Sequence, residues 1–218
     1  MMSSLTHKEL RECAGILAIG GLALFAVAAA NMGLQPLSGM FSSPSRGEIP
    51  FLGDGFQFEL GVVAFLLAIA LGFRQSLGDF LGDAHIFLLH RPVARRRIYG
   101  AKLAVGLAGY LLLTAAAILA YWLWAATPGT HASPFDWPMT APAWTLWLAI
   151  SLVYLGAFLS GIRPGAWMGT RLAPLAAVTL AAAALMAAPI WIAWLAAIAC
   201  DALLIVLILH VAATRDFA

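Results

Sequence analysis

The sequence predicts an all-α membrane protein with six transmembrane helices and both termini in the cytoplasm. Its 218 residues are 63% hydrophobic and only 10% charged, whereas soluble domains carry about 25% charged residues. Several stretches reach the length of about 20 apolar residues that a membrane-spanning helix needs. The few basic residues are also distributed unevenly between the intervening loops, which indicates an orientation. These observations exclude a soluble domain.

Six apolar segments are expected to cross the membrane within one transmembrane domain, residues 1–218. The third is long enough to begin in the cytoplasm or to tilt. The last two lie in one apolar stretch that is interrupted by Pro189, and proline disfavours helix at the residue before it. We expect a tight hairpin there, with five spans and a re-entrant pair as the alternative. The expected spans are residues 13–32, 56–73, 98–126, 143–160, 172–188 and 190–213.

The orientation follows from the Lys and Arg residues, which are enriched in cytoplasmic loops. With the N-terminus inside, Arg46 is the only one of the twelve on the outer side. Trp favours the membrane interface, and seven of the eight Trp residues fall near the expected outer ends of the spans. The eleven inner residues are Lys8, Arg11, Arg74, Arg91, Arg95, Arg96, Arg97, Lys102, Arg163, Arg171 and Arg215.

The N-terminal residues predict a short helix before the first span. Thr6 and Glu9 have the S/T-x-x-E spacing of a capping box, and residues 5–12 suit an amphipathic helix along the inner membrane surface. Charges before the first apolar run, and the lack of a convincing A-x-A exit after it, disfavour a cleaved signal peptide. Cys13 and Cys200 lack metal-ligand spacing and are expected to be packing residues.

The inner loop between the second and third spans carries a basic block, residues 87–102, with the sequence FLLHRPVARRRIYGAK. Apolar residues precede it, and Pro92 breaks the apolar run before the arginines. This pattern predicts a short helix at the inner surface within residues 77–97. A loop that only fixes the orientation is the alternative interpretation.

This segment resembles one in the permease subunits of type-2 ATP-binding-cassette (ABC) exporters. In that family the segment between spans two and three often reads LLxRPVSRRRIxxGK, and residues 88–102 resemble that pattern, with Ala94 where Ser or Thr is common and Ala101 where the pattern has Gly. The family is also similar to this chain in having six spans, cytoplasmic termini and an amphipathic N-terminal helix. A short hairpin at Pro189 departs from the exporters that carry an elaborated outer helical pair.

The resemblance implies that residues 77–97 form a coupling helix that docks on a cytosolic ABC ATPase subunit. It also implies a second permease copy or a homologous permease as a partner, in contact with membrane lipid in a bacterial cytoplasmic membrane. The transported substrate is not specified. The residues expected to contact the ATPase are Ile86, Phe87, Leu88, Leu89, Arg91, Pro92 and Arg95.

No nucleotide-binding motif is present in this chain. Lys8 and Lys102 are its only lysines, and neither follows the G-x-x-x-x-G-K-[ST] pattern of a phosphate-binding loop. Any ATP would therefore be bound and hydrolysed by a separate subunit, and no cofactor is expected here. The net charge of +2 gives no indication of a nucleic-acid partner.

Asp201 is the one carboxylate expected well inside a span. A charge there costs about 2.5–3.5 kcal/mol on insertion scales, so the side chain should face the bundle, a cavity or a partner. A proton relay or a translocation contact is one interpretation, and a hydrogen bond that holds helices together is the other. His210 does not share its helix face. Glu59, near the outer mouth of the second span, is expected to be a solvated carboxylate.

Small residues at spacings of four are expected to allow close helix approach. They occur at Gly156, Ala157, Ser160 and Gly161 in the fourth span and at Gly100, Ala104 and Ala108 in the third. The contacts could lie within the chain or across a dimer.

Two other functions are compatible with the sequence. A membrane subunit that anchors or regulates a partner without transporting would need the same docking loop. An intramembrane enzyme would use Asp201 with a histidine, but the spans supply almost no partner at the same depth.

Overall fold

The computed structural model describes residues 2–34, 49–52, 55–77, 94–131, 134–163 and 170–214, with side chains from Leu5 onward. Within these ranges the chain is helical, and no strand occurs. The helices are α1 (Met2–Asn31), α2 (Phe56–Leu77), α4 (Arg95–Ala126), the 3₁₀ turn η2 (Trp137–Thr140), α5 (Ala141–Ile162), α6 (Ala173–Met186) and α7 (Ile190–Thr214).

Five of these helices, α1, α2, α4, α5 and α7, are long and apolar enough to cross a membrane. The chain is therefore a polytopic helical membrane protein, as predicted. The expected fifth span, 172–188, forms only the 14-residue helix α6. At 1.5 Å per residue, that helix is about 21 Å long, shorter than the hydrocarbon core of about 30 Å.

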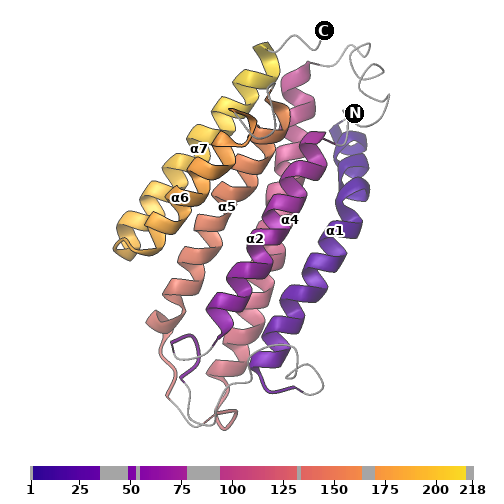
Figure 1. Cartoon of the computed structure of the whole chain (residues 1–218). Coiled ribbons are helices and arrows are strands. Elements are labelled where there is room, and N and C mark those ends of the chain that lie inside the picture. Colours follow the sequence, from indigo (N-terminus) through magenta and orange to yellow (C-terminus); the bar gives the residue numbers. More distant parts are fainter. Residues whose placement is uncertain are drawn as a thin grey trace.

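The helices run up and down as a bundle with two distinct ends (Figure 1). Met2, Leu77, Arg95 and Thr214 lie at one end, which we call the basic end because the described arginines of the expected inner loops lie there or beside it. The two ends of the described chain thus share one end of the bundle, as the predicted topology requires. Which side of a membrane this end faces remains a prediction.

The opposite end is rich in aromatic side chains, and we call it the aromatic end. Phe56 of α2 stacks on Tyr121 of α4 with ring centroids 4.1 Å apart. Trp122 stacks on Trp137 at 4.5 Å. This gathering agrees with the prediction that most Trp residues lie near one membrane interface.

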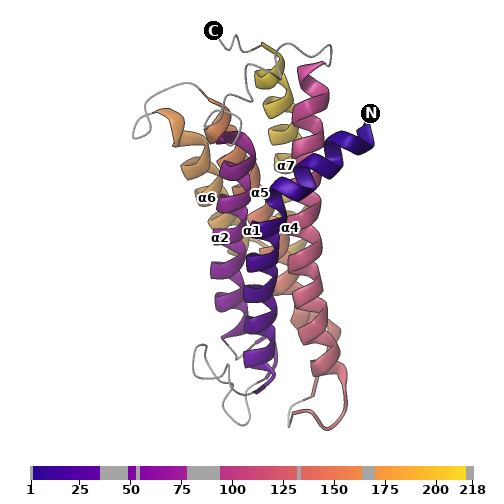
Figure 2. The same cartoon turned by 90° about the vertical axis from the view of Figure 1, so that its right-hand side faces the viewer.

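The first helix differs from the prediction. A separate surface helix over residues 5–12 was expected, but α1 runs without a break from Met2 to Asn31. Since the helix begins four residues before Thr6, the Thr6–Glu9 pair does not cap it. No proline interrupts residues 5–16, so nothing stops the helix there. Figure 2 shows that the first turns of α1 lean away from the rest of the helix.

The predicted hairpin at Pro189 is present. The helix α6 ends at Met186 and α7 begins at Ile190, because proline cannot donate the backbone hydrogen bond that would continue α6. The Ala187 and Ala188 amides instead donate to Ala184 and Leu185 carbonyls at 3.1 and 3.2 Å. Both helices pack mainly against α5 and contact each other far less, and Figure 2 shows them apart from each other.

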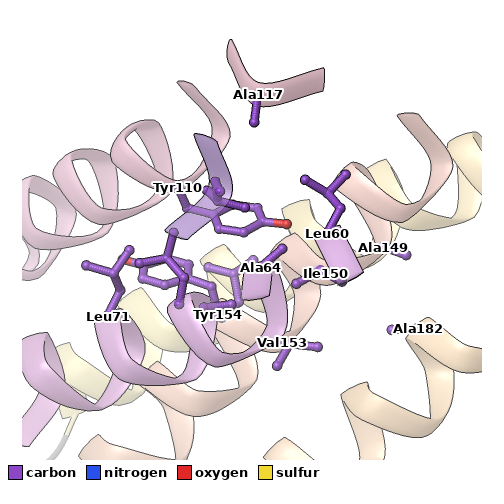
Figure 3. Packing of buried hydrophobic residues seen from close by; sticks show 14 of the residues in the cluster. Leu60, Ala64, Leu71, Tyr110, Ala117, Ala149, Ile150, Val153, Tyr154 and Ala182 are labelled. Atoms are coloured by element: carbon purple, nitrogen blue, oxygen red, sulfur yellow. The ribbon is translucent and has the colours of Figure 1, made fainter. Parts of the chain in front are cut away.

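The helix α5 forms the centre of the bundle and contacts α2, α4, α6 and α7. In its most apolar window 83% of the residues are buried, against 17% for α7. Figure 3 shows Tyr154 of α5 and Tyr110 of α4 among the aliphatic side chains of this core. The exposed apolar surface of α7 suits contact with lipid or with another membrane subunit.

Candidate functional site

The predicted ATPase contacts fall mostly outside the described residues. Of that set only Arg95 is described, and it is the first residue of α4 and is partly buried. Arg96 and Arg97 follow it and are exposed. The other six, Ile86, Phe87, Leu88, Leu89, Arg91 and Pro92, lie within the range 78–93, which is outside the described residues.

A buried ion pair joins the leaning start of α1 to α4 near the basic end. The Lys102 ammonium Nζ lies 3.0 Å from the Glu9 carboxylate Oε2, with side-chain exposures of 2% and 1%. Long charged side chains are rarely this buried unless they are paired. The pair therefore neutralises two charges inside the apolar bundle.

Two further helices reach the same place. The Gln75 side chain of α2 donates from Nε2 to the Lys102 backbone carbonyl at 2.9 Å. The Tyr154 hydroxyl of α5 donates to Gln75 Oε1 at 2.7 Å. We call Glu9, Gln75, Lys102 and Tyr154 the inner polar network. Each of the four has at most 3% of its surface exposed, so water does not compete for these bonds.

The helix α4 comes very close to the inner polar network at Gly106. A Cβ placed at Gly106 would overlap Gln75 Oε1 and the Tyr154 hydroxyl. The helix α4 can therefore approach the Gln75–Tyr154 pair only because this position has no side chain. At Gly100, two turns earlier on the same helix, a Cβ would meet nothing within 4 Å.

The last turns of α2 are fixed to α5 beside the network. A Cβ at Gly72 would lie 2.7 Å from the Tyr154 carbonyl oxygen, and one at Gly161 would overlap Ser76 Oγ. The Ser76 hydroxyl donates a hydrogen bond to the Gly72 carbonyl at 2.7 Å. This bond provides the buried hydroxyl with a partner where α2 and α5 touch. The α2 segment that precedes residue 78 is thus held closely against α5.

Asp201 faces the bundle, as one of the predicted options required. Its Oδ2 accepts a hydrogen bond from the Ser151 hydroxyl of α5 at 2.6 Å. Its buried Oδ1 has no hydrogen-bond partner among the described residues. His210 is exposed on α7, so the two are not brought together. The contact fits the interpretation that Asp201 holds α7 against α5.

Glu59 differs from its expected role as a solvated carboxylate. The Asn31 side chain at the end of α1 donates to Glu59 Oε2 at 2.8 Å and to the Val27 carbonyl at 3.0 Å. Asn31 is fully buried. The pair ties α1 to α2 at the aromatic end. No residue spacing indicates this pair, because the partners lie on different helices.

The two sets of small residues differ in whether they allow the expected close approach of helices. Gly156 lets α6 approach α5, since a Cβ there would overlap Val178. Ala104 and Ala108 are exposed instead. They line an open groove of about 480 Å³ between α4 and the start of α1. Gly100 also touches no neighbour through its Cβ position, so this second set makes no close contact within the described chain.

Sequence reasoning missed the inner polar network. The sequence pattern places Lys102 in the basic block of the inner loop, and it places Glu9 in a capping box. One signal could have found the pair. Lys102 lies inside the third expected span, 98–126, and a charge at that position requires a partner. Gln75 and Tyr154 gave no signal, because their roles depend on helix packing.

No group of three or more His, Cys, Asp or Glu side chains that could hold a metal occurs among the described residues. No family model matches the chain, and neither a curated protein nor a solved structure is significantly similar to it.

Proposed function

We propose that this chain is the membrane permease subunit of an ABC exporter, driven by a separate cytosolic ATPase. The observation that carries the proposal is the match of residues 88–102 to the coupling segment of type-2 exporter permeases. The transported substrate stays open. The chain would act without a cofactor of its own, in a bacterial cytoplasmic membrane.

The bundle supports this proposal through the position of the matched segment. It connects α2 to α4 at the basic end, which also carries Met2 and Thr214. Basic residues favour the cytoplasmic side, where an ATPase would be available. The leading Ile86–Leu89 side chains would then fill an apolar cleft of the ATPase, and Arg91 and Arg95 would set the register.

The test is purification of the tagged full-length chain from its native membrane. We expect an ABC ATPase to copurify, and its ATP hydrolysis rate to depend on the chain. Leu88→Asp or Arg91→Glu should weaken this association at least tenfold, because each places a carboxylate in the docking surface. Arg163→Glu, at the other expected inner loop, is the matched control and should retain it.

The outcomes separate the proposal from its alternatives. A non-transporting anchor would bind the ATPase through the same segment but leave its hydrolysis rate unchanged. An intramembrane enzyme would copurify with no ATPase. Normal ATPase binding and activity in both docking variants would refute the coupling role of residues 86–95.

A further inference from the structure

The inner polar network joins both flanks of the predicted coupling segment. That segment comprises residues 77–97, so Gln75 lies two residues before it and Lys102 lies five residues after it. The Gln75 amide donates directly to the Lys102 carbonyl at 2.9 Å. The inner ends of α2 and α4 are therefore bonded to each other inside the bundle.

The same network continues to α1 and α5, which do not flank the segment. Through the ammonium of Lys102 it reaches Glu9 on α1, at 3.0 Å. Through the amide oxygen of Gln75 it reaches Tyr154 on α5, at 2.7 Å. A displacement of α2 or α4 at this level would break one of these bonds or move its partner.

Breaking the bonds in place is unfavourable because the groups are buried. An unpaired charge or hydrogen-bonding group without access to water retains its full desolvation penalty. A Cβ at Gly106 would overlap Gln75 Oε1 and the Tyr154 hydroxyl, so α4 packs closely against this pair. The four side chains are thus positioned to move together.

We propose that the inner polar network transmits movement from the inner ends of α2 and α4 to α1 and α5. Glu9, Gln75, Lys102 and Tyr154 act as positioning residues, and none of them contacts a substrate in this role. The proposal rests on the proposed function, because the ATPase is the source of the movement. It adds the residues through which the membrane helices would respond.

Cys13 is a native reporter of this network. It follows Glu9 by four residues and so shares its helix face, and it is fully buried. Cys200 is the other cysteine in the chain, and Cys200→Ser leaves Cys13 as the single thiol. The rate at which N-ethylmaleimide modifies Cys13 then measures how often the α1 contact opens.

The first experiment measures this rate in monodisperse detergent-solubilised protein. Gln75→Leu and Gly106→Ala should each raise it at least tenfold, because each disrupts the bonds around Lys102. Gly100→Ala adds the same methyl group to α4 in open space and should leave the rate unchanged. Equal rates in all variants would overturn the network as a tie between helices.

The second experiment adds the copurifying ATPase. Nucleotide binding should change the Cys13 modification rate at least threefold in the unaltered network. Gln75→Leu should keep ATPase binding but lose most of the stimulated hydrolysis, and Gly100→Ala should keep both. Glu9→Lys and Lys102→Glu should each lose stimulation, whereas the double charge exchange should recover it. A purely structural role predicts instead that stimulation follows the yield of folded protein, so loss of stimulation in single variants that keep the unaltered yield would contradict it.

Failure of this inference is distinguishable from failure of the proposed function. If no ATPase copurifies with the unaltered chain, the proposed function fails and the transmitting role fails with it. If the ATPase binds and is stimulated normally by Gln75→Leu and Gly106→Ala, only the inference is overturned. Cys13 modification that is insensitive to nucleotide would overturn it as well.

Discussion

Lys102 shows how one residue can organise several helices. Its side chain is 2% exposed, and its ammonium lies 3.0 Å from the Glu9 carboxylate. A buried pair is not in itself strongly stabilising, but removing one partner leaves an uncompensated charge. The pair therefore acts chiefly by specifying where α1 lies against α4.

The Glu9–Lys102 pair predicts a strong double-mutant coupling. Glu9→Gln or Lys102→Met alone should each destabilise the protein by about 3–5 kcal/mol, because the remaining charge is buried. The double variant should lose less stability than the sum of the losses in the two single variants. Thermal unfolding in detergent would measure this, and additive effects would contradict a direct pair.

The Asp201–Ser151 bond predicts a smaller effect. Ser151→Ala removes the hydrogen-bond donor to Asp201 Oδ2, while the Asp201 Oδ1 already has no partner among the described residues. The free energy of unfolding should therefore fall by about 1–3 kcal/mol. Thr127→Ala, an exposed hydroxyl that bonds within its own helix turn, should stay within about 0.5 kcal/mol of the unaltered chain. The unfolding midpoints of the two variants test this, and equal midpoints would argue against a structural role for Asp201.

At the scale of helices, apolar length predicted most of the architecture. Expected spans 56–73, 98–126, 143–160 and 190–213 lie within α2, α4, α5 and α7, respectively, apart from small shifts at their ends. Hydropathy responds to continuous apolar sequence, which these helices have. It could not predict the short α6 in a stretch that is apolar throughout.

The start of α1 and the candidate site were predicted less well. A capping box and an amphipathic pattern are local signals, whereas the continuation of α1 is accompanied by a contact between Glu9 and Lys102, 93 residues apart. The inner polar network depends on such distant contacts at every step. The coupling residues came from a local sequence pattern, and for that reason they could be named without the fold.

The α5–α6 contact predicts a specific sensitivity to volume. Gly156→Ala places a methyl group against Val178 and should destabilise the protein by about 1–3 kcal/mol through overpacking. Gly100→Ala makes the same change where no neighbour lies within 4 Å and should be near neutral. Unfolding midpoints of the two variants would test this, and a neutral Gly156→Ala would contradict the close packing of α6.

At the scale of the whole molecule, the bundle has a basic end and an aromatic end. This polarity matches the asymmetry that membranes impose on charged and aromatic residues. It places Leu77 and Arg95, where α2 ends and α4 begins, at the same end of the bundle as both ends of the described chain.

The topology predicts opposite accessibilities for the two ends of the bundle. In a chain lacking Cys13 and Cys200, Thr127→Cys should react with a membrane-impermeant maleimide on intact cells whose outer envelope has been removed. Thr214→Cys should react only after lysis, because basic loops face the cytoplasm. The reverse pattern would invert the orientation and remove the ATPase from reach of the predicted coupling segment.

The most direct test of the central claim is a photo-crosslink from the coupling segment in the native membrane. A p-benzoylphenylalanine probe replaces Phe87, and the same probe at Phe58, a 78% exposed residue of α2 near the aromatic end, serves as the matched control. We expect Phe87→p-benzoylphenylalanine to crosslink an ABC ATPase, and the control to give no such product. Absence of an ATPase crosslink from position 87, or an equal yield from position 58, would contradict the proposed docking.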